Sequence, residues 1–337
     1  MSRAADRAFC AAMLPQVSRT FALGIRLLPA GLRESVGTAY LLCRIADTIE
    51  DTPALGIARQ RQLLAEFTAA LDGQDQALEG LRESFDEREG PEARLAASAA
   101  AVLRVFHNLP DADRAAVRPW VAEMARGMAE FASMTQETPG GLTSLASVAD
   151  LDRYCYYVAG TVGHLLTALF RTHHRGIDDD RFARLDALAT SFGLGLQLTN
   201  IVKDVADDRR RGWSFVPRDL CQMAGIQPAD LADPAHADQA ARVMAMLIAK
   251  ARDHLDDALA YCLLLPRSAW RIRIFCLTSL YFAVATLRLA ERDPRLLDPA
   301  HKVKITRTAV RRTVAITHMI ASSNALVRRY FQRLATT

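Results

Sequence analysis

Two stretches decide the fold: Tyr40-Leu-Leu-Cys-Arg-Ile-Ala-Asp-Thr-Ile-Glu-Asp51 and Gln197-Leu-Thr-Asn-Ile-Val-Lys-Asp-Val-Ala-Asp-Asp208. Polar residues recur in both at helical spacing, as Tyr40, Arg44, Asp47 and Asp51 in the first and Gln197, Asn200, Asp204 and Asp208 in the second. At about 3.6 residues per turn, each set forms one stripe along a helix. Apolar residues such as Leu41 and Leu198 flank the stripes, so both stretches predict apolar helices that carry one acidic face.

The carboxylates on each stripe predict a magnesium site. Two carboxylates one helical turn apart repel each other and therefore need cations. Oxygen ligands without Cys or His suit Mg²⁺, which keeps several waters and joins carboxylates to substrate phosphates. A single pair of this kind is usually a solvated face, and Asp178-Asp179-Asp180 and Asp256-Asp257 are interpreted in that way. Two stripes on apolar helices instead predict two facing metal–diphosphate clamps.

The rest of the chain predicts an all-α protein. Ala, Leu and Arg recur at helical periods, whereas the alternation typical of strands is nearly absent. We expect about ten helices, with ends uncertain by a few residues, over 3–14, 31–50, 56–72, 93–108, 111–135, 149–171, 180–208, 237–264, 267–291 and 301–335. Because no flexible linker separates them, we expect a single all-helical domain over residues 1–337.

Composition excludes several classes of protein. The chain has 337 residues with 42 Lys and Arg against 38 Asp and Glu, a balance that does not favour nucleic acid. Its longest charge-free stretch, Tyr154–Phe170, and the apolar Ile274–Leu287 are both shorter than the roughly 20 residues of a membrane span. No apolar segment follows the charged start, and the six cysteines have no metal-binding spacing. We expect a cytoplasmic protein with reduced, buried thiols.

At these motifs the chain resembles the squalene/phytoene synthase family of head-to-head isoprenyl diphosphate synthases. The resemblance covers most of the chain, through Ser18-Arg19-Thr20-Phe21, Asp47-Thr48-Ile49-Glu50-Asp51, Gly127-Met128-Ala129-Glu130-Phe131, Tyr154 to Gly163, Asp204 to Asp208, and a C-terminal helix from Val303 to Phe331. The first acidic motif and Gly127 to Phe131 look more like squalene synthases than phytoene synthases. The resemblance implies a helical bundle with a central apolar channel and a prenyltransferase that joins two farnesyl diphosphates.

The resemblance also implies roles for residues on both stripes. The metal ligands it implies are Asp47, Asp51, Asp204 and Asp208, with Glu50 and Asn200 as further ligands and Asp207 in a supporting position. The cations it implies around the diphosphate are Arg19, Arg44 and Lys203, with Arg209 to Arg211 on the loop after the second motif. Gln197 is assigned to the substrate site, and Phe21 either lines the channel or packs in the core.

The chemistry that the resemblance implies begins with ionisation of an allylic diphosphate, assisted by Mg²⁺. The second prenyl double bond attacks the cation, and loss of a proton gives presqualene diphosphate. A second ionisation and rearrangement, followed by hydride transfer from NADPH, would give squalene. Tyr154 is the first candidate for the proton acceptor and Tyr40 the second, although Tyr154, Tyr156 and Tyr157 could instead be packing aromatics with one polar end.

The NADPH contacts cannot be placed from the sequence. Gly160, Gly163, Gly193 and Gly195 form no dinucleotide-binding motif, because no strand precedes them; close helix packing or room for a prenyl chain would explain them. His164 is interpreted as a satisfied core residue.

One departure leaves the product open. Squalene synthases commonly carry an arginine where this chain has Trp213. The first hypothesis is that the product is squalene. The alternative products are presqualene diphosphate, dehydrosqualene or C20-derived phytoene. A non-catalytic helical assembly protein is a third reading. The oligomeric state is undetermined, and loose association with the inner membrane surface through a patch near the channel mouth is a further hypothesis.

Overall fold

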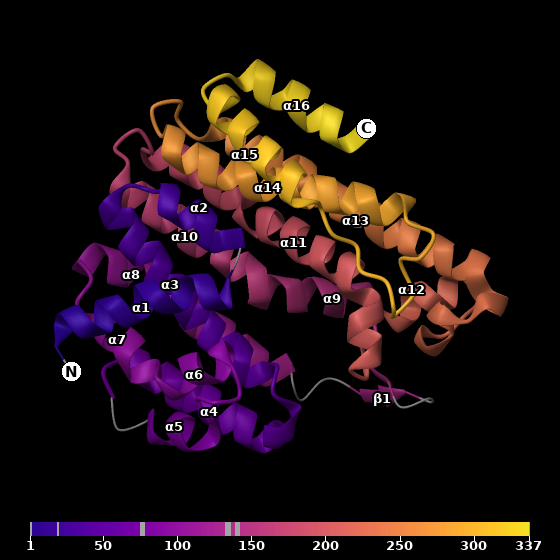
Figure 1. The fold of residues 1–337 in the computed structure, drawn as a ribbon, viewed down its shortest axis with the longest axis horizontal. Coiled ribbons are helices and arrows are strands. Elements are labelled where there is room, and N and C mark those ends of the chain that lie inside the picture. The colour runs from indigo at the N-terminus through magenta and orange to yellow at the C-terminus, as the bar shows by residue number, and fades with distance from the viewer. Residues whose placement is uncertain (1, 19, 75–77, 132–135, 139–141, 337) are drawn as a thin grey trace. The chain divides into compact units, whose positions relative to one another are not determined.

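The computed structural model describes residues 2–18, 20–74, 78–131, 136–138 and 142–336, and it confirms the all-α prediction (Figure 1). The α-helices are α1 (Arg3–Val17), α2 (Thr20–Leu27), α3 (Ala30–Glu50), α4 (Gly56–Leu71), α5 (Glu79–Ser84), α6 (Pro91–Ala97), α7 (Ala99–His107), α8 (Asp111–Phe131), α9 (Val148–Cys155), α10 (Thr161–His173), α11 (Asp179–Arg210), α12 (Arg218–Met223), α13 (Ala237–Leu264), α14 (Trp270–Arg292), α15 (Arg307–Ile320) and α16 (Asn324–Thr336).

Short elements join these helices. They are the 3₁₀ turns η1 (Pro53–Leu55), η4 (Pro228–Ala232) and η5 (Pro234–His236), the π-helical turn η3 (Tyr156–Gly160), and the strands β1 (Gln136–Thr138), β2 (Leu142–Ser144) and β3 (Trp213–Ser214). The strands form one small sheet in the order β1-β2-β3, with β1 antiparallel and β3 parallel to β2.

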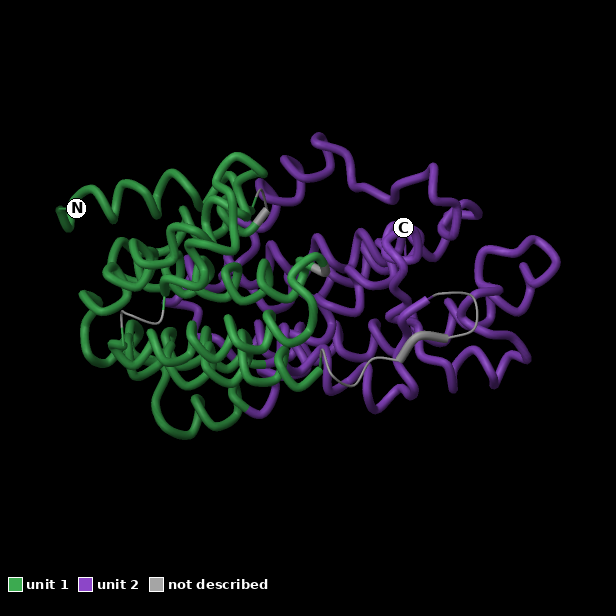
Figure 2. Tube along the Cα trace, turned by 90° about the horizontal axis from the view of Figure 1, so that it is seen from below, with its two compact units in different colours: residues 1–134, 161–186 green, residues 135–160, 187–337 purple. Residues whose placement is uncertain are grey.

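The chain divides into two compact units (Figure 2). Unit 1 consists of Met1–Met134 and Thr161–Asp186, and unit 2 of Thr135–Gly160 and Ala187–Thr337. The first acidic stretch therefore belongs to unit 1 and the second to unit 2. The expectation of a single domain over 1–337 stays a prediction.

Unit 1 is built around α3, which packs against α1, α7, α8 and α10. Most of its side chains are buried, among them Leu42, Ile45 and Ile49. The buried Asp113 of α8 fastens the helices together, because its carboxylate accepts hydrogen bonds from Ser35 of α3 and His173 of α10. This packing leaves one face of α3 only partly covered, and that face carries the acidic stripe.

Unit 2 depends on a close approach between α11 and its neighbours. A Cβ added to Gly193 would lie 2.2 Å from the carbonyl oxygen of Ala159, and one added to Gly195 would lie 3.1 Å from the carbonyl carbon of His254. Only glycine lets the backbones of η3 and α13 approach α11 so closely. Helix packing, one of the two explanations expected for these glycines, therefore accounts for Gly193 and Gly195.

Among the described helices, α14 alone is long and apolar enough to cross a membrane. The sequence did not predict a span at α14, because arginines interrupt the helix and leave only the short charge-free stretch Ile274–Leu287. Of the apolar window, 72% is buried inside the protein, where α13, α15 and α16 pack on α14. Such burial is typical of a core helix, so length and composition are weak evidence for a membrane span here.

The expected helix over 301–335 is wrong. An irregular segment runs to Thr306, and two helices follow in place of one, so the expected C-terminal helix from Val303 is also corrected. The hydroxyl of Thr306 accepts a hydrogen bond from the backbone N–H of Ala309 and begins α15, and that of Ser323 accepts one from Leu326 and begins α16. Hydroxyl side chains favour such N-cap positions over helix interiors.

Smaller differences have similar local causes. The expected helix over 149–171 is interrupted by η3, and that over 93–108 is two helices that meet at Ser98. Helices α2, α5 and α12 were not expected, since each has eight residues or fewer and shows little periodicity. All six cysteines are buried and free, as predicted.

Candidate metal and diphosphate sites

The first acidic stripe lies at the C-terminal end of α3, on the face that packing leaves open. Tyr40, Arg44, Asp47 and Glu50 are partly covered and Asp51 is exposed, whereas the residues between them are buried. The guanidinium of Arg44 lies 3.7 Å from the carboxylate of Asp47 and 3.6 Å from that of Glu92 on α6. The prediction of one partly exposed polar stripe on an apolar helix is confirmed.

Negative charge on this stripe is poorly compensated. Burial raises the pKa of Asp47 to about 7; Arg44 opposes this shift and the charge of Asp51 adds to it. Burial also raises the pKa of Glu50, with further contributions from Asp51 and Asp47. Carboxylates that resist ionisation in this way bind a divalent cation favourably, because its charge replaces the missing positive partner.

The donor set of this stripe fits Mg²⁺. Within the described ranges no three His, Cys, Asp or Glu side chains converge closely enough to form a complete cage for a metal. Mg²⁺ does not need such a cage, because it commonly binds one or two carboxylates and completes its shell with waters and substrate phosphates. Asp47, with Glu50 and Asp51 beside it, offers that kind of partial oxygen site. Their assignment as ligands stays a prediction.

Arg44 is suited to bind an anion at the same place. Its Nε is buried and has no hydrogen-bond partner among the described residues. A guanidinium is a forked donor that matches phosphate oxygens. Glu92, the second carboxylate near Arg44, was missed by sequence analysis because nothing in its own stretch distinguishes it from a surface acid.

Tyr40 and Phe21 lie together in unit 1. Their ring centroids are 5.8 Å apart, and the Tyr40 hydroxyl donates a hydrogen bond of 3.4 Å to the carbonyl of Val17. Burial raises the pKa of the Tyr40 phenol. Phe21 is partly exposed, with its backbone N–H bonded to the Ser18 hydroxyl. Arg19 lies outside the described residues.

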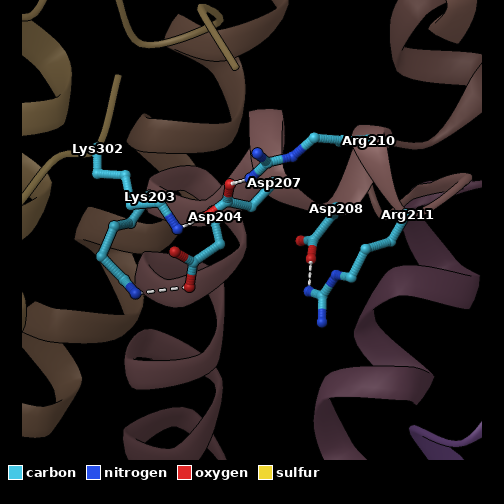
Figure 3. A network of polar contacts seen from close by, with 7 residues as sticks. All are labelled: Lys203, Asp204, Asp207, Asp208, Arg210, Arg211 and Lys302. Carbon is cyan, nitrogen blue, oxygen red and sulfur yellow. Dashed lines mark hydrogen bonds and ion pairs between the residues drawn. The ribbon is translucent and has the colours of Figure 1, made fainter. Parts of the chain in front are cut away.

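The second acidic stripe, on α11, is covered by cations (Figure 3). Lys203 contacts Asp204 at 2.5 Å, and Arg211 pairs with the buried carboxylate of Asp208. Asp207 pairs with Arg210 and, at 2.7 Å, with Lys302 from the irregular segment before α15. The hydrogen bond from Lys302 holds the pKa of Asp207 below its usual range, with help from Arg210.

The structure corrects the expected placement of the arginines after the second motif. Arg209 and Arg210 belong to the last turn of α11 rather than to a loop. The guanidinium of Arg209 donates to the carbonyls of Pro228 and Ala229, so it anchors η4 to the helix end. Asn200 is exposed and Gln197 partly exposed on the same helix. Lys302 was missed because it lies far along the chain in a segment that was expected to be helical.

Tyr154 belongs to an aromatic stack in unit 2. The buried Tyr154 ring on α9 stacks on Phe215 with centroids 4.8 Å apart, and Phe215 stacks on Trp213 at 5.9 Å. The π-helical turn η3 directly follows α9. Such turns are rare and occur frequently at functional sites. Trp213, the departure noted in the sequence, therefore contributes to the support beneath Tyr154.

His164 is a satisfied residue, as expected. Its ring stacks on Trp120 with centroids 4.5 Å apart, and its Nδ1 lies 2.6 Å from the carboxylate of Asp186. These contacts explain the residue by packing and hydrogen bonding within unit 1.

Comparison with known proteins connects both stripes to one family. The squalene/phytoene synthase family pattern matches residues 14–309. A squalene synthase of Schizosaccharomyces pombe is 31% identical over 298 residues, which are 88% of this chain and 62% of that protein. The squalene synthase of Bos taurus is 28% identical over 330 residues, covering 96% of this chain and 73% of that protein. This chain thus spans less than two thirds of the length of the S. pombe relative.

Solved structures agree with this connection. A ligand complex of TcSQS superposes with a TM-score of 0.82 at 27% identity, covering 98% of this chain and 91% of that one. A dehydrosqualene synthase, at 21% identity and a TM-score of 0.65, shares the fold.

Proposed function

The chain belongs to the squalene/phytoene synthase family, and we propose that it condenses two farnesyl diphosphates head to head through presqualene diphosphate. In the same proposal, it reduces the product to squalene with NADPH. The single observation that carries the proposal is the pair of acidic stripes, with Asp47 and Asp51 on α3 and Asp204 and Asp208 on α11. A helical protein without catalytic function would have no use for Asp47 and Glu50, whose charged forms burial and the neighbouring carboxylates make costly.

The acidic stripes provide the proposed site for Mg²⁺. The chemistry that Mg²⁺ held there would supply is neutralisation of a leaving diphosphate, which would assist ionisation of the allylic C–O bond. On α3 the ligands would be Asp47, Asp51 and Glu50, and on α11 Asp204, Asp208 and Asn200. Lys203 and Arg211 contact two of the α11 carboxylates, so a metal that takes the same oxygens would displace both cations.

The released cations have a second role. Once displaced from their carboxylates, Lys203 and Arg211 can donate hydrogen bonds to diphosphate oxygens, as Arg44 can from unit 1. Such charge-assisted hydrogen bonds are about twice as strong as neutral ones. Each cation would thus exchange its carboxylate partner for a diphosphate oxygen. Before the substrate binds, the same cations balance the charge of the α11 carboxylates.

Tyr154 is the proposed proton acceptor for closure of the cyclopropane ring. Its ring is fixed by the stack on Phe215, so its hydroxyl is held in one orientation. A phenol with an ordinary pKa near 10 is a weak base, which avoids capture of the carbocation, and it needs an onward acceptor such as a diphosphate oxygen.

NADPH enters the proposal as the reductant that would donate a hydride to the final carbocation. The described elements include no β–α–β unit of the dinucleotide-binding kind, because the strands have two or three residues each. Trp213 stands where an arginine is common in squalene synthases, so dehydrosqualene, presqualene diphosphate or C20-derived phytoene is the competing outcome.

The test is to incubate the purified protein with Mg²⁺ and either farnesyl diphosphate or geranylgeranyl diphosphate, with and without NADPH, and to identify products by mass spectrometry. We expect presqualene diphosphate without NADPH and squalene with it. Dehydrosqualene or presqualene diphosphate under both conditions would reject the reductive step. Conversion of geranylgeranyl diphosphate alone would indicate a phytoene synthase, and no turnover of either substrate would contradict the proposed function.

A further inference from the structure

Positive charge is concentrated at the C-terminal end of the chain. Residues 294–337 contain nine Lys and Arg but one acid, Asp298, which gives this segment a net charge of +8 in a chain whose total is +4. The preceding residues, 1–293, are therefore net acidic. The small overall charge conceals a strong asymmetry, and such asymmetry indicates a partner of opposite charge.

The charged segment forms a helical hairpin. Helices α15 and α16 pack on each other and on α14, and Figure 1 shows α16 beside α15 and α14. The inner faces meet at Tyr281 of α14, whose hydroxyl donates to the carbonyl of Val327 and whose ring meets that of Tyr330 edge-on. Tyr330 in turn lies within hydrogen-bond distance of Thr313. The opposite faces of both helices are exposed.

These exposed faces carry arginines without counterions. Within the described residues, no hydrogen bond or ion pair joins another residue to the guanidinium groups of Arg307, Arg311, Arg312, Arg328, Arg329 and Arg333. All six are exposed. On both helices they lie opposite the buried positions or flank them, as Arg312 flanks Thr313 and Arg328 flanks Val327.

Large apolar side chains are exposed at the turn of the hairpin. Met319, near the end of α15, is 73% exposed, and Leu326, in the first turn of α16, is 47% exposed. Trp270, at the start of α14, is 44% exposed and carries the guanidinium of Arg271 over its ring. The buried Arg273 of α14 connects this helix to the turn of the hairpin, because its guanidinium donates to the Ala321 carbonyl and to the Asn324 side chain.

We infer that the exposed face of the α15–α16 hairpin docks on an anionic lipid bilayer, with its arginines against the headgroups and Met319, Leu326 and Trp270 inserted at the interface. A basic helical face beside exposed apolar and aromatic side chains is the composition of a membrane-surface element. The inference rests on charge and exposure alone and does not depend on the proposed reaction. It places membrane association on the hairpin, whereas the hypothesis drawn from the sequence placed it at a patch near the channel mouth.

A bilayer fits this face better than a nucleic acid does. The phosphates of a duplex would pair with the arginine guanidinium groups. The exposed methionine, leucine and tryptophan beside them would gain nothing, because they would stay in contact with water. In a bilayer the same side chains lose their contact with water, which adds to the electrostatic attraction. Binding to a nucleic acid is therefore the competing outcome of the test.

The first experiment measures binding to vesicles by flotation. The vesicles are pure phosphatidylcholine or phosphatidylcholine mixed with phosphatidylglycerol. We expect binding to the mixture only, weakened by salt. The triple variant Arg311→Glu, Arg312→Glu and Arg329→Glu should bind at least about a hundredfold more weakly, since each arginine contributes roughly fivefold.

A matched variant controls for net charge. Arg61→Glu, Arg82→Glu and Arg88→Glu change three exposed arginines of unit 1 and alter the net charge equally. This control should bind vesicles to within a few fold of wild type, and thermal melts should show that both triple variants are folded. Equal loss of binding in the two variants would overturn the assignment to the hairpin, as would wild-type binding to duplex DNA but not to the mixed vesicles.

The second experiment locates the apolar tip. Brominated acyl chains in the mixed vesicles should quench the fluorescence of the wild-type protein, and Trp270→Phe should remove most of that quenching. The chain's other two tryptophans, Trp120 and Trp213, provide the signal that remains. Undiminished quenching in Trp270→Phe would show that a different surface meets the bilayer and would overturn the inference.

Discussion

The two acidic stripes look alike in sequence but differ in how their charge is balanced. On α3, Asp47 and Glu50 are partly buried carboxylates whose pKa values are raised. On α11, Asp204, Asp207 and Asp208 each lie against a lysine or arginine, and the pKa of Asp207 is lowered. On the first stripe burial outweighs the ion pair of Arg44 with Asp47, whereas on the second each of these three carboxylates is paired with a cation of the protein.

This difference separates two ways of holding a diphosphate. Under the proposed function, the α3 stripe would bind a cation without first releasing one, and the same burial that raises the pKa of Asp47 makes its charged form costly. On the α11 stripe, a metal would compete with Lys203 and Arg211 for the carboxylates of Asp204 and Asp208. The contrast predicts that mutations at the two stripes have similar effects on turnover but opposite effects on stability.

The largest expected effect is on turnover. Asp47→Asn and Asp204→Asn should each reduce kcat by about a thousandfold or more, because metal stabilisation of the leaving group is worth several kcal/mol. Product formation from farnesyl diphosphate measures it. Asp253→Asn, an exposed acid on α13, is the control and should retain wild-type activity. Activity near wild type in either stripe variant would remove that stripe from the reaction.

The second-largest expected effect is on proton transfer, and it is tested at one tyrosine from each unit. Tyr154→Phe should lower kcat by about a hundredfold, the lower range for a proton-transfer group, while KM for farnesyl diphosphate stays within a few fold of wild type. Tyr40→Phe should have a smaller effect, because the Tyr40 hydroxyl is bonded to the carbonyl of Val17. The reverse order would make Tyr40 the proton acceptor and Tyr154 a packing residue.

Stability should respond to pH in opposite directions at the two stripes. The pKa of Asp47 is about 7 in the folded protein and near 4 when unfolded, so the folded state binds more protons between these values. Its contribution therefore disfavours folding increasingly as pH rises through this range. The lowered pKa of Asp207 gives the opposite sign, a contribution present at neutral pH and lost in acid.

Thermal melts in EDTA test this contrast. At neutral pH, Asp47→Asn should melt a few degrees above wild type, and the difference should vanish towards pH 4. Asp207→Asn should melt at or slightly below wild type at neutral pH and converge with it in acid. An Asp47→Asn variant that is less stable than wild type at neutral pH would mean that other groups compensate the α3 stripe.

The sequence predicted both stripes because helical periodicity places their residues on one face regardless of the rest of the fold. It could not distinguish their electrostatics, since Glu92 and Lys302 reach the stripes from segments far along the chain. The break at Ser323 was missed because a few local cap hydrogen bonds outweigh a long run of helix-forming residues. The role of Gly193 needed coordinates, because only the backbone of Ala159 shows that a side chain there has no room.

The smallest expected effect belongs to the contact between Lys302 and Asp207. Lys302 is 52% exposed, and such ion pairs contribute about 1 kcal/mol or less. Lys302→Ala should therefore lower the melting temperature only slightly, and it should raise the pKa of Asp207 because the largest cause of its lowering is removed. Carboxyl titration followed by NMR measures this shift directly.

Two further variants show whether the charge itself is responsible. Lys302→Arg keeps the positive charge and should keep the lowered pKa of Asp207, whereas Arg295→Ala removes an exposed cation elsewhere in the same irregular segment and should leave it unchanged. If Lys302→Ala has no effect on Asp207, Arg210 alone neutralises that carboxylate. The cations that pair with the α11 carboxylates would then all lie in the second acidic motif or directly after it. The electrostatic difference between the α11 and α3 stripes would then be determined by nearby sequence alone.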